Sequence, residues 1–233
     1  MPTKTFKMTN KAILFDLDGT LVETAPDLMA AHNHVMEKYG HEKKPLSDIR
    51  YLAGRGAATM LLRSVESQEG RNNKIDEQTH KIMTKDFIDY YAANISKKST
   101  INDGVIEFLD WCKSKKIQLA VCTNKMERLT IKLLKEIKLY DYFDYIAGAD
   151  TFNYRKPDPM HLTSILEILN VPIENSIMVG DSETDADAAK AAKIKFILVK
   201  GGYTEKNYDQ IFKDHLIENF RDIKPLSQKI LGI

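Results

Sequence analysis

The sequence predicts an α/β fold, a doubly wound parallel sheet with a helical domain inserted into it. Short apolar runs of the kind that form buried strands alternate with segments of helical spacing, which is typical of a parallel sheet covered by helices on both faces. Residues 25–95 interrupt this alternation, because they show helical spacing and no convincing strand. We therefore predict an α/β core from residues 1–22 and 97–233 and a helical domain from residues 23–96.

The individual elements follow from the same patterns in chain order. Ala12–Leu17 is an apolar run that ends in an acid, and a Gly-Thr turn follows it, which favours a buried strand. Leu28, Ala31 and Val35 then recur at helical spacing. Further strands are predicted at Gln118–Thr123, Tyr145–Ala149, Ser176–Gly180 and Lys195–Val199, with helices near 104–115, 126–138, 159–170 and 184–192.

Composition excludes several classes of protein. The 233-residue chain has 34 basic and 33 acidic residues, so it lacks the basic excess of a nucleic-acid-binding protein. No apolar stretch approaches the roughly 20 residues that span a bilayer, and residues 1–10 are too polar for a secretory signal. Cys112 and Cys122 lack the spacing of a metal site, which favours reduced thiols. We expect a cytoplasmic protein with no nucleic-acid or membrane partner.

Asp16 and Asp18 are the first candidate functional residues. Alternate side chains of a strand face the same side, so these carboxylates are expected to project together from the strand's carboxyl end. Open parallel sheets bind their ligands at that end. Carboxylates held so close repel unless a cation or a shared proton offsets their charge. Taken alone, the pair is equally compatible with two loop acids that cap the next turn.

Two later motifs also follow strands. Thr123 and Asn124 lie where a strand meets a helix, a position that suits phosphate oxygens but also an ordinary helix cap. Lys156 lies in Arg155-Lys156-Pro157-Asp158-Pro159, whose prolines favour a rigid turn and the start of a helix. By itself, Lys156 is most simply a solvated lysine.

The strand predicted at Ser176–Gly180 leads into Asp181, and Asp185 follows four residues later. Asp181 alone could be the N-cap of the next helix. Each of these motifs has such an ordinary explanation, yet all of them follow strands of one α/β chain. Because the carboxyl ends of parallel strands meet at one edge of a sheet, we expect a single site there.

These motifs, in this order and spacing, resemble the haloacid dehalogenase superfamily of phosphatases and, within it, the phosphoglycolate phosphatase-like subgroup. The resemblance extends over nearly the whole chain and implies a Rossmann-like core with an inserted all-helical cap domain. The chain departs from the subgroup outside the motifs, for example at Glu23-Thr24, where Asp-Ser is common. The matches are Asp16-Leu17-Asp18-Gly19-Thr20-Leu21 for the first motif, Thr123 for the second, Lys156 for the third, and Gly180-Asp181 with Asp185 for the fourth.

The resemblance also implies a chemistry. Asp16 would be the nucleophile that forms an aspartyl-phosphate, and Asp18 would be the general acid and base. Mg²⁺ would be the cofactor, since hard cations of this kind prefer oxygen ligands. Thr123, Asn124 and Lys156 would hold the phosphate oxygens. The implied metal ligands are Asp16, the backbone carbonyl of Asp18, and Asp181, with Asp185 orienting Lys156 or a metal-bound water.

The cap would close over a small-molecule phosphate ester, with 2-phosphoglycolate as the favoured substrate. Within Gly54-Arg55-Gly56, Arg55 could pair with a substrate carboxylate or second phosphate, although a surface arginine in an ordinary turn fits equally well. A sugar-phosphate phosphatase and a phosphomutase of the same superfamily are the alternatives. The oligomeric state is open between a monomer and a homodimer.

Two hypotheses from other classes use a similar set of residues. A phosphoacceptor signalling module also places acids, a Thr or Ser and a Lys at the ends of parallel strands. Such a module is much shorter, has no inserted cap, and gives Asp18 no role. A catalytically silent binding protein on the same scaffold would not need all four motifs, and all four are intact here.

Overall fold

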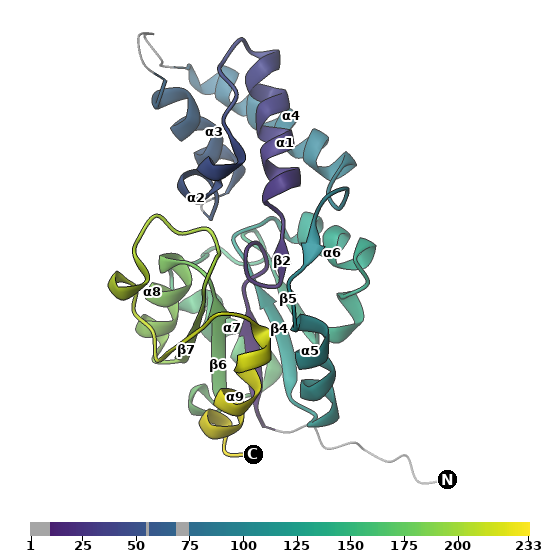
Figure 1. Ribbon diagram of the computed structural model, residues 1–233, viewed down its shortest axis with the longest axis vertical. Helices are drawn as coiled ribbons and strands as arrows, with labels where there is room; N and C mark the ends of the chain where they lie inside the picture. The colour runs from purple at the N-terminus through teal and green to yellow at the C-terminus, as the bar shows by residue number, and fades with distance from the viewer. Residues whose placement is uncertain (1–9, 55, 69–74) are drawn as a thin grey trace.

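The computed structural model describes residues 10–54, 56–68 and 75–233. Six strands form one parallel sheet in the order β5-β4-β1-β6-β7-β8, and helices cover both of its faces (Figure 1). This arrangement confirms the predicted α/β core. The strands are β1 (Ala12–Phe15), β4 (Gln118–Cys122), β5 (Tyr145–Ala147), β6 (Ser176–Gly180), β7 (Lys195–Val199) and β8 (His215–Ile217).

The central strand, β1, explains why the sheet is covered on both sides. All four of its side chains are fully buried, and they alternate between two hydrophobic clusters. Ile13 and Phe15 pack on one face, and Ala12 and Leu14 pack on the other. A central parallel strand is therefore apolar along its whole length. The first face is covered by α5 (Val105–Ser114), α6 (Glu127–Glu136) and α9 (Ile223–Leu231), and the second by α7 (Met160–Leu169) and α8 (Glu183–Ala192).

Residues 25–93, which we call the helical insertion, lie beyond the carboxyl end of the sheet (Figure 1). The long helices α1 and α4 pack along each other, and α3 packs on α4. The apolar side chains between them join the same hydrophobic cluster that covers one face of the sheet. The helices of the insertion are α1 (Ala25–Lys38), α2 (Ile49–Leu52), α3 (Ala57–Glu66) and α4 (Glu77–Ala93).

The chain enters and leaves the helical insertion through a short antiparallel ribbon. Its strands are β2 (Val22–Glu23) and β3 (Thr100–Ile101). The Asp27 carboxylate, in the first turn of α1, accepts hydrogen bonds from the backbone N–H groups of Lys98 and Ser99 at 2.9 and 2.8 Å. These hydrogen bonds join the segment that enters the helical insertion to the segment that leaves it.

Sequence patterns missed four of these elements. Strands β2 and β3 have two residues each, and β8 has three, so none is long enough to show alternation. The short helix α9 was also not predicted. The first strand ends at Phe15, two residues before the predicted Leu17. Asp16 and Asp18 therefore follow the strand in a loop, and the rule that alternate strand residues face the same side does not govern them.

Two further predictions concern the state of the cysteines and membrane-spanning helices. Cys112 and Cys122 are both buried and free, in agreement with the expected thiols. Among the described residues, no helix combines the length and the apolar composition that crossing a membrane requires.

His161 provides a test of the packing on the second face of the sheet. Its ring is completely buried in the first turn of α7. Burial, and secondarily the Lys156 ammonium, lowers the pKa of His161 from 6.5 to about 4. The unfolded chain therefore takes up a proton at a higher pH than the folded chain does. The stability that depends on neutral His161 is present above pH 6.5 and is lost as the pH falls toward 4.

We expect this one group to cost about 3 kcal/mol of unfolding free energy between pH 6.5 and pH 4. His161→Leu should flatten the pH dependence by that amount in urea unfolding measured across this range. The control is His34→Leu, because His34 is exposed on α1 and its loss should leave the slope unchanged. Identical slopes for wild type and His161→Leu would mean that the buried ring does not govern the acid response.

Candidate active site

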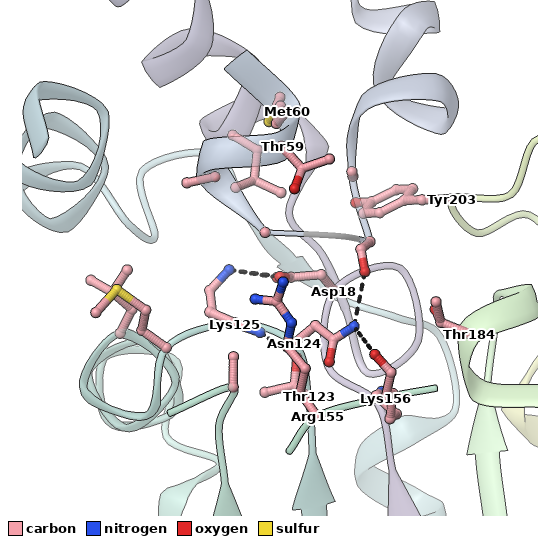
Figure 2. Close-up of a pocket in the computed structure, with 18 of the residues that line it drawn as sticks. Asp18, Thr59, Met60, Thr123, Asn124, Lys125, Arg155, Lys156, Thr184 and Tyr203 are labelled. Atoms are coloured by element: carbon pink, nitrogen blue, oxygen red, sulfur yellow. Dashed lines mark hydrogen bonds and ion pairs between the residues drawn. The ribbon is translucent and has the colours of Figure 1, made fainter. Parts of the chain in front are cut away.

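A cavity of about 250 Å³ lies between the carboxyl end of the sheet and the helical insertion. The insertion contributes mostly apolar side chains to it, such as Met60, Phe87 and Tyr91. The core contributes the polar side chains, and Figure 2 shows several of them pointing into the cavity. The structure brings all of the site residues named from the motifs to this cavity: Asp16, Asp18, Thr123, Asn124, Lys156, Asp181 and Asp185.

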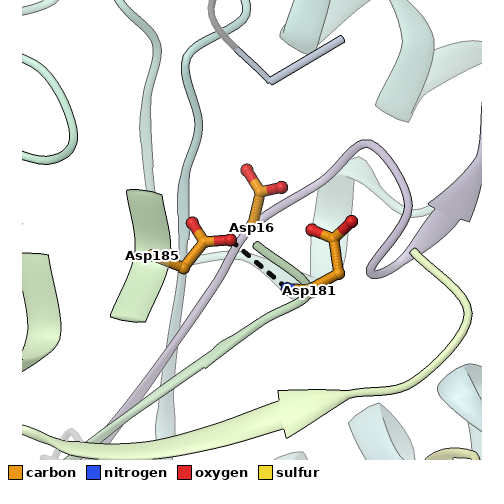
Figure 3. A group of neighbouring side chains, drawn as sticks. All are labelled: Asp16, Asp181 and Asp185. Atoms are coloured by element: carbon orange, nitrogen blue, oxygen red, sulfur yellow. Dashed lines mark hydrogen bonds between the residues drawn. The ribbon is translucent and has the colours of Figure 1, made fainter. Parts of the chain in front are cut away.

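Asp16, Asp181 and Asp185 form an acidic cluster at the floor of this cavity. One carboxylate oxygen from each lies within 4.8 Å of the others, and all three residues are buried. Figure 3 shows the carboxylates converging. Asp16 comes from the loop after β1, Asp181 from the segment that joins β6 to α8, and Asp185 from the first turn of α8. Because β1 and β6 are hydrogen-bonded neighbours, their carboxyl ends deliver these acids to one point.

Asp181 is held by partners from distant parts of the chain. Its carboxylate accepts a hydrogen bond from the Thr20 hydroxyl at 3.1 Å and another from the Tyr203 backbone N–H. A Cβ atom on Gly202 would lie 2.0 Å from an Asp181 carboxylate oxygen, so only glycine leaves room for that oxygen. The N-cap of α8 is Ser182, so the interpretation of Asp181 as a helix cap is wrong.

Lys156 and Asp185 form a buried pair beside Asp16. The Lys156 ammonium donates to Asp16 Oδ1 at 2.8 Å and to Asp185 Oδ1 at 2.5 Å. The other Asp185 oxygen accepts from the backbone N–H and hydroxyl of Ser182 at 3.1 and 2.7 Å, which completes the capping box of α8. Asp185 thus fixes the direction of Lys156 and the start of α8 with its two oxygens.

The electrostatics of this group reflect burial first and charge second. Burial raises the pKa of Asp16 to about 6, although Lys156 opposes the rise and Asp185 adds to it. Burial, together with the Asp16 and Asp185 carboxylates, raises the pKa of Asp181 well above 3.8. Burial disfavours the Lys156 ammonium, but the Asp16 and Asp185 carboxylates outweigh it and raise its pKa. The site therefore holds more negative charge than its lysine offsets.

This donor set fits a hard divalent cation. The three clustered groups are carboxylates, and oxygen donors of this kind are the ligands that Mg²⁺ prefers over softer metals. Burial and, after it, mutual repulsion raise the pKa values of Asp16 and Asp181, and a cation would stabilise the charged carboxylates against both effects. The acidic cluster can therefore hold a metal ion.

Asp18 has a separate set of partners. The Lys125 ammonium donates to its two oxygens at 2.8 and 2.7 Å (Figure 2). The Thr24 hydroxyl donates to Asp18 Oδ1 at 2.8 Å. Lys125 also lies 4.6 Å from the centre of the Tyr91 ring on α4 of the helical insertion. Asp18 lines the cavity with Asp16 but is not one of the three clustered carboxylates. Each of the two acids has its own lysine.

Lys125 was not singled out by sequence reasoning, although it directly follows Thr123 and Asn124. Its burial was the missing information, because a lysine beside a turn is ordinarily solvated. Burial disfavours the Lys125 ammonium, but the Asp18 carboxylate and the Tyr91 phenol outweigh that effect and raise its pKa. Lys125 is therefore a second buried cation of the cavity.

Thr123 and Asn124 form the part of the cavity wall that follows β4. Thr123 is almost fully buried, and its hydroxyl accepts a hydrogen bond from the Lys125 backbone N–H at 3.2 Å. The Asn124 side-chain amide donates to the carbonyls of Gly54 and Lys156 at 3.1 and 3.0 Å, so it joins the helical insertion to the core. The N-cap of α6 is Met126, so the ordinary helix-cap interpretation of Thr123 and Asn124 is wrong.

Two arginines are considered for substrate specificity. Arg55, the predicted specificity residue, lies outside the described residues. Arg155 lines the cavity from the core side, and its guanidinium reaches up toward the helical insertion in Figure 2. A Cβ atom on Gly56 would lie 3.8 Å from the Arg155 guanidinium, so this part of the insertion closely approaches it.

The chain is similar to known phosphatases in both sequence and structure. A family model described as haloacid dehalogenase-like hydrolase matches residues 13–199. A phosphoglycolate phosphatase from Mesorhizobium japonicum is 37% identical over 213 residues, which cover 91% of this chain and 92% of that protein.

Two solved structures extend the comparison. A predicted phosphoglycolate phosphatase from Haemophilus somnus superposes with a TM-score of 0.89 and 27% identity, covering 95% of this chain and all of that one. CbbY from Rhodobacter sphaeroides, solved with phosphate, has a TM-score of 0.79 and 25% identity, covering 91% of this chain and 96% of that one. A mutant of CbbY was solved with xylulose-1,5-bisphosphate. Because the family model and the curated relatives match most of its length, this chain belongs to the haloacid dehalogenase-like hydrolase family and is a phosphoric monoester hydrolase.

Proposed function

We propose that this protein is a Mg²⁺-dependent phosphatase that hydrolyses a small phosphorylated metabolite, 2-phosphoglycolate, through an aspartyl-phosphate on Asp16. The observation that carries this proposal is the buried acidic cluster of Asp16, Asp181 and Asp185 with the Lys156 ammonium at its edge. Mg²⁺, held by Asp16, the Asp18 backbone carbonyl and Asp181, would neutralise charge between the nucleophile and the phosphate. The name of the Mesorhizobium relative supports the substrate.

In the first half of the reaction, an Asp16 carboxylate oxygen attacks phosphorus. The new bond joins that oxygen to phosphorus, and the bond from phosphorus to the ester oxygen breaks. Asp18, in its protonated form, gives a proton to the departing alkoxide. Lys125 and Thr24 orient the Asp18 side chain, because their hydrogen bonds hold it at the cavity wall.

In the second half, water attacks the phosphorus of the aspartyl-phosphate and Asp18 takes a proton from it. The bond from phosphorus to Asp16 then breaks, which restores the carboxylate. Thr123, the Asn124 backbone and Lys156 hold the transferring oxygens. Donors that are already oriented stabilise the charge that develops there, and Asp185 keeps Lys156 oriented through its 2.5 Å hydrogen bond.

The core and the helical insertion have different roles in this proposal, and the residues that line the cavity support the distinction. Residues 1–22 and 97–233 form the core that carries the chemistry, and residues 23–96 form a cap that excludes water from it. The mostly apolar lining from the helical insertion supports this role, because closing such a surface over the phosphate site removes solvent.

A sugar phosphate is the second candidate substrate. The specific observation is the likeness to CbbY, whose mutant was solved with xylulose-1,5-bisphosphate. The cavity, at about 250 Å³, is slightly smaller than a typical drug-binding pocket, which supports a small metabolite in either case. Released phosphate from a panel of esters with Mg²⁺ separates the two candidates.

Asp16→Asn should abolish this reaction. The amide keeps the shape of the side chain but is neither a nucleophile nor an anionic ligand, so we expect less than about 1% of wild-type phosphate release, a loss above ~2.7 kcal/mol. The assay is phosphate release from 2-phosphoglycolate with Mg²⁺, and circular dichroism checks the fold. The matched control is Asp187→Asn, because Asp187 is exposed on α8. Substantial turnover by Asp16→Asn would remove the covalent role.

Asp181→Asn should raise the Mg²⁺ concentration needed for half-maximal activity much more than it raises the substrate KM. The reason is that Asp181 contacts the proposed metal position and belongs to the acidic cluster. We expect a shift of roughly tenfold or more, since each lost charged ligand contact exceeds 1.4 kcal/mol. Mg²⁺ titrations of the activity of wild type, Asp181→Asn and Asp187→Asn measure this shift. Activity that persists after exhaustive chelation would exclude a metal-dependent reaction.

Arg155→Ala should discriminate between substrates. If the Arg155 guanidinium binds a second anionic group of the substrate, its loss removes roughly 1.5–3 kcal/mol of charged hydrogen bonding. We expect kcat/KM for 2-phosphoglycolate to fall by about ten- to a hundredfold and that for an aryl phosphate to change little. The control is Arg128→Ala, an exposed arginine on α6. Equal losses for both esters would mean that Arg155 supports the structure of the site.

A further inference from the structure

Tyr203 joins the acidic cluster to the point where the chain enters the helical insertion. It follows Gly201-Gly202 after β7, and only 6% of its surface is exposed. Its backbone and its phenol bind different parts of the site. This double attachment is distinct from the catalytic roles assigned above, because Tyr203 contacts Asp181 through its backbone alone.

The backbone of Tyr203 is fixed to Asp181. Its N–H donates to Asp181 Oδ2, and Gly202 packs against the same carboxylate so closely that a Cβ atom would not fit. A displacement of the Asp181 carboxylate therefore has to move the backbone at 202–203. The reverse also holds, since the two groups share one tightly packed contact.

The phenol of Tyr203 is fixed to the start of α1. Its oxygen accepts hydrogen bonds from the backbone N–H groups of Thr24 and Ala25 at 2.9 and 2.7 Å. Its hydroxyl donates to the Glu23 carboxylate. Burial and the Glu23 carboxylate both raise the pKa of Tyr203, so the phenol stays protonated and can donate. Residues 22–25, which we call the hinge, thus depend on a side chain from the far end of the core.

The phenol supplies a hydrogen-bond acceptor at the start of α1, where Thr24 makes no side-chain cap. Thr24 is the N-cap residue of α1 but makes no side-chain cap, because its hydroxyl donates to Asp18. The first N–H groups of a helix need acceptors from outside the helix. At α1 the Ala25 N–H donates to the Tyr203 oxygen at 2.7 Å and to Glu23 Oε1 at 2.9 Å, and the same Glu23 oxygen accepts from the Tyr203 hydroxyl. Tyr203 and Glu23 together hold the first turn.

The same loop also reaches the body of the helical insertion. Glu205, two residues after Tyr203, accepts a hydrogen bond from the Arg63 guanidinium of α3 at 2.6 Å. Thr204 donates to Glu183 at the start of α8. The segment 202–205 is therefore attached to the acidic cluster, the hinge and the insertion within four residues.

We propose that Tyr203 is a positioning residue that couples a cation bound at the acidic cluster to the hinge, so that occupancy at Asp181 orders the start of α1 and holds the helical insertion over the cavity. The coupling rests on the proposed Mg²⁺ dependence. A cation fixes the Asp181 carboxylate, the carboxylate fixes the Tyr203 backbone, and the phenol then fixes the N–H groups of Thr24 and Ala25. Such a coupling is reciprocal, because a hinge held by Tyr203 must favour cation binding by the same factor.

Tyr203→Phe tests the coupling, because it removes the hydroxyl and leaves the ring and the backbone N–H to Asp181 in place. Two measurements on the full chain are needed: hydrogen exchange of the Thr24 and Ala25 amides with and without Mg²⁺, and Mg²⁺ affinity by calorimetry. The matched control is Tyr142→Phe, which removes a phenol–carboxylate hydrogen bond to Asp110 on the core surface. Glu23→Ala is the second variant in case Tyr203→Phe folds poorly. It removes the acceptor of the Tyr203 hydroxyl and one of the two acceptors of the Ala25 N–H, and it leaves Asp181 untouched.

In wild type and Tyr142→Phe, Mg²⁺ should slow exchange of the two amides by roughly three- to tenfold, the range expected for one to two hydrogen bonds. In Tyr203→Phe this effect should vanish, and the Kd for Mg²⁺ should rise by about the same factor. Glu23→Ala should reduce both effects in parallel. A merely structural phenol would speed exchange equally with and without Mg²⁺ and leave the Kd unchanged.

Three results would overturn the coupling: undiminished Mg²⁺ protection of the hinge amides in Tyr203→Phe, an unchanged Mg²⁺ affinity in that variant, or wild-type Mg²⁺ binding without any hinge protection. Failure of the proposed function looks different. In that case calorimetry would detect no Mg²⁺ binding to wild type at all, and phosphate release would continue in the presence of a chelator.

Discussion

The repulsion among three buried carboxylates is the constraint on which the rest of this structure depends. Asp16, Asp181 and Asp185 lie within reach of one ion, and burial, with charge repulsion added to it, raises the pKa of Asp16 and Asp181. A fold keeps such a cluster only if it supplies compensating donors or a cation, since an uncompensated buried charge is costly. Here the compensation is built from Lys156, the capping box of α8, and backbone and hydroxyl donors around Asp181.

The two aspartates of the proposed chemistry, Asp16 and Asp18, are paired with different lysines. Lys156 bonds to Asp16 on the side of the acidic cluster, and Lys125 bonds to Asp18 on the side of the helical insertion. Lys125 also packs on the Tyr91 ring of α4, so the surroundings of Asp18 include the helical insertion. Tyr203 makes the corresponding connection from Asp181 to the hinge. Asp18 and Asp181 are thereby both linked to the helical insertion or to its first residues.

Much of the fold and of the site follows from sequence patterns. Five strands of the sheet, including β1 and β6, were predictable because buried parallel strands are continuous apolar runs. Their order along the chain indicated where polar residues would gather, which brought Asp16, Lys156 and Asp181 to attention. The short strands escaped prediction because two or three residues carry no periodicity. The nine-residue helix α9 was also not predicted. Lys125 escaped because a single lysine carries no sign of its burial.

By itself the sequence determined which residues follow the strands, because apolar runs, turn residues and polar ends are local properties of the chain. It also determined the helical character of the insertion. Only the tertiary structure decided which lysine pairs with which aspartate. It also decided which distant side chain accepts hydrogen bonds at the start of α1. Those choices join residues far apart in the sequence, such as Lys125 with Asp18 and Tyr203 with Thr24. They depend on how neighbouring strands and loops pack, and local patterns do not encode such contacts.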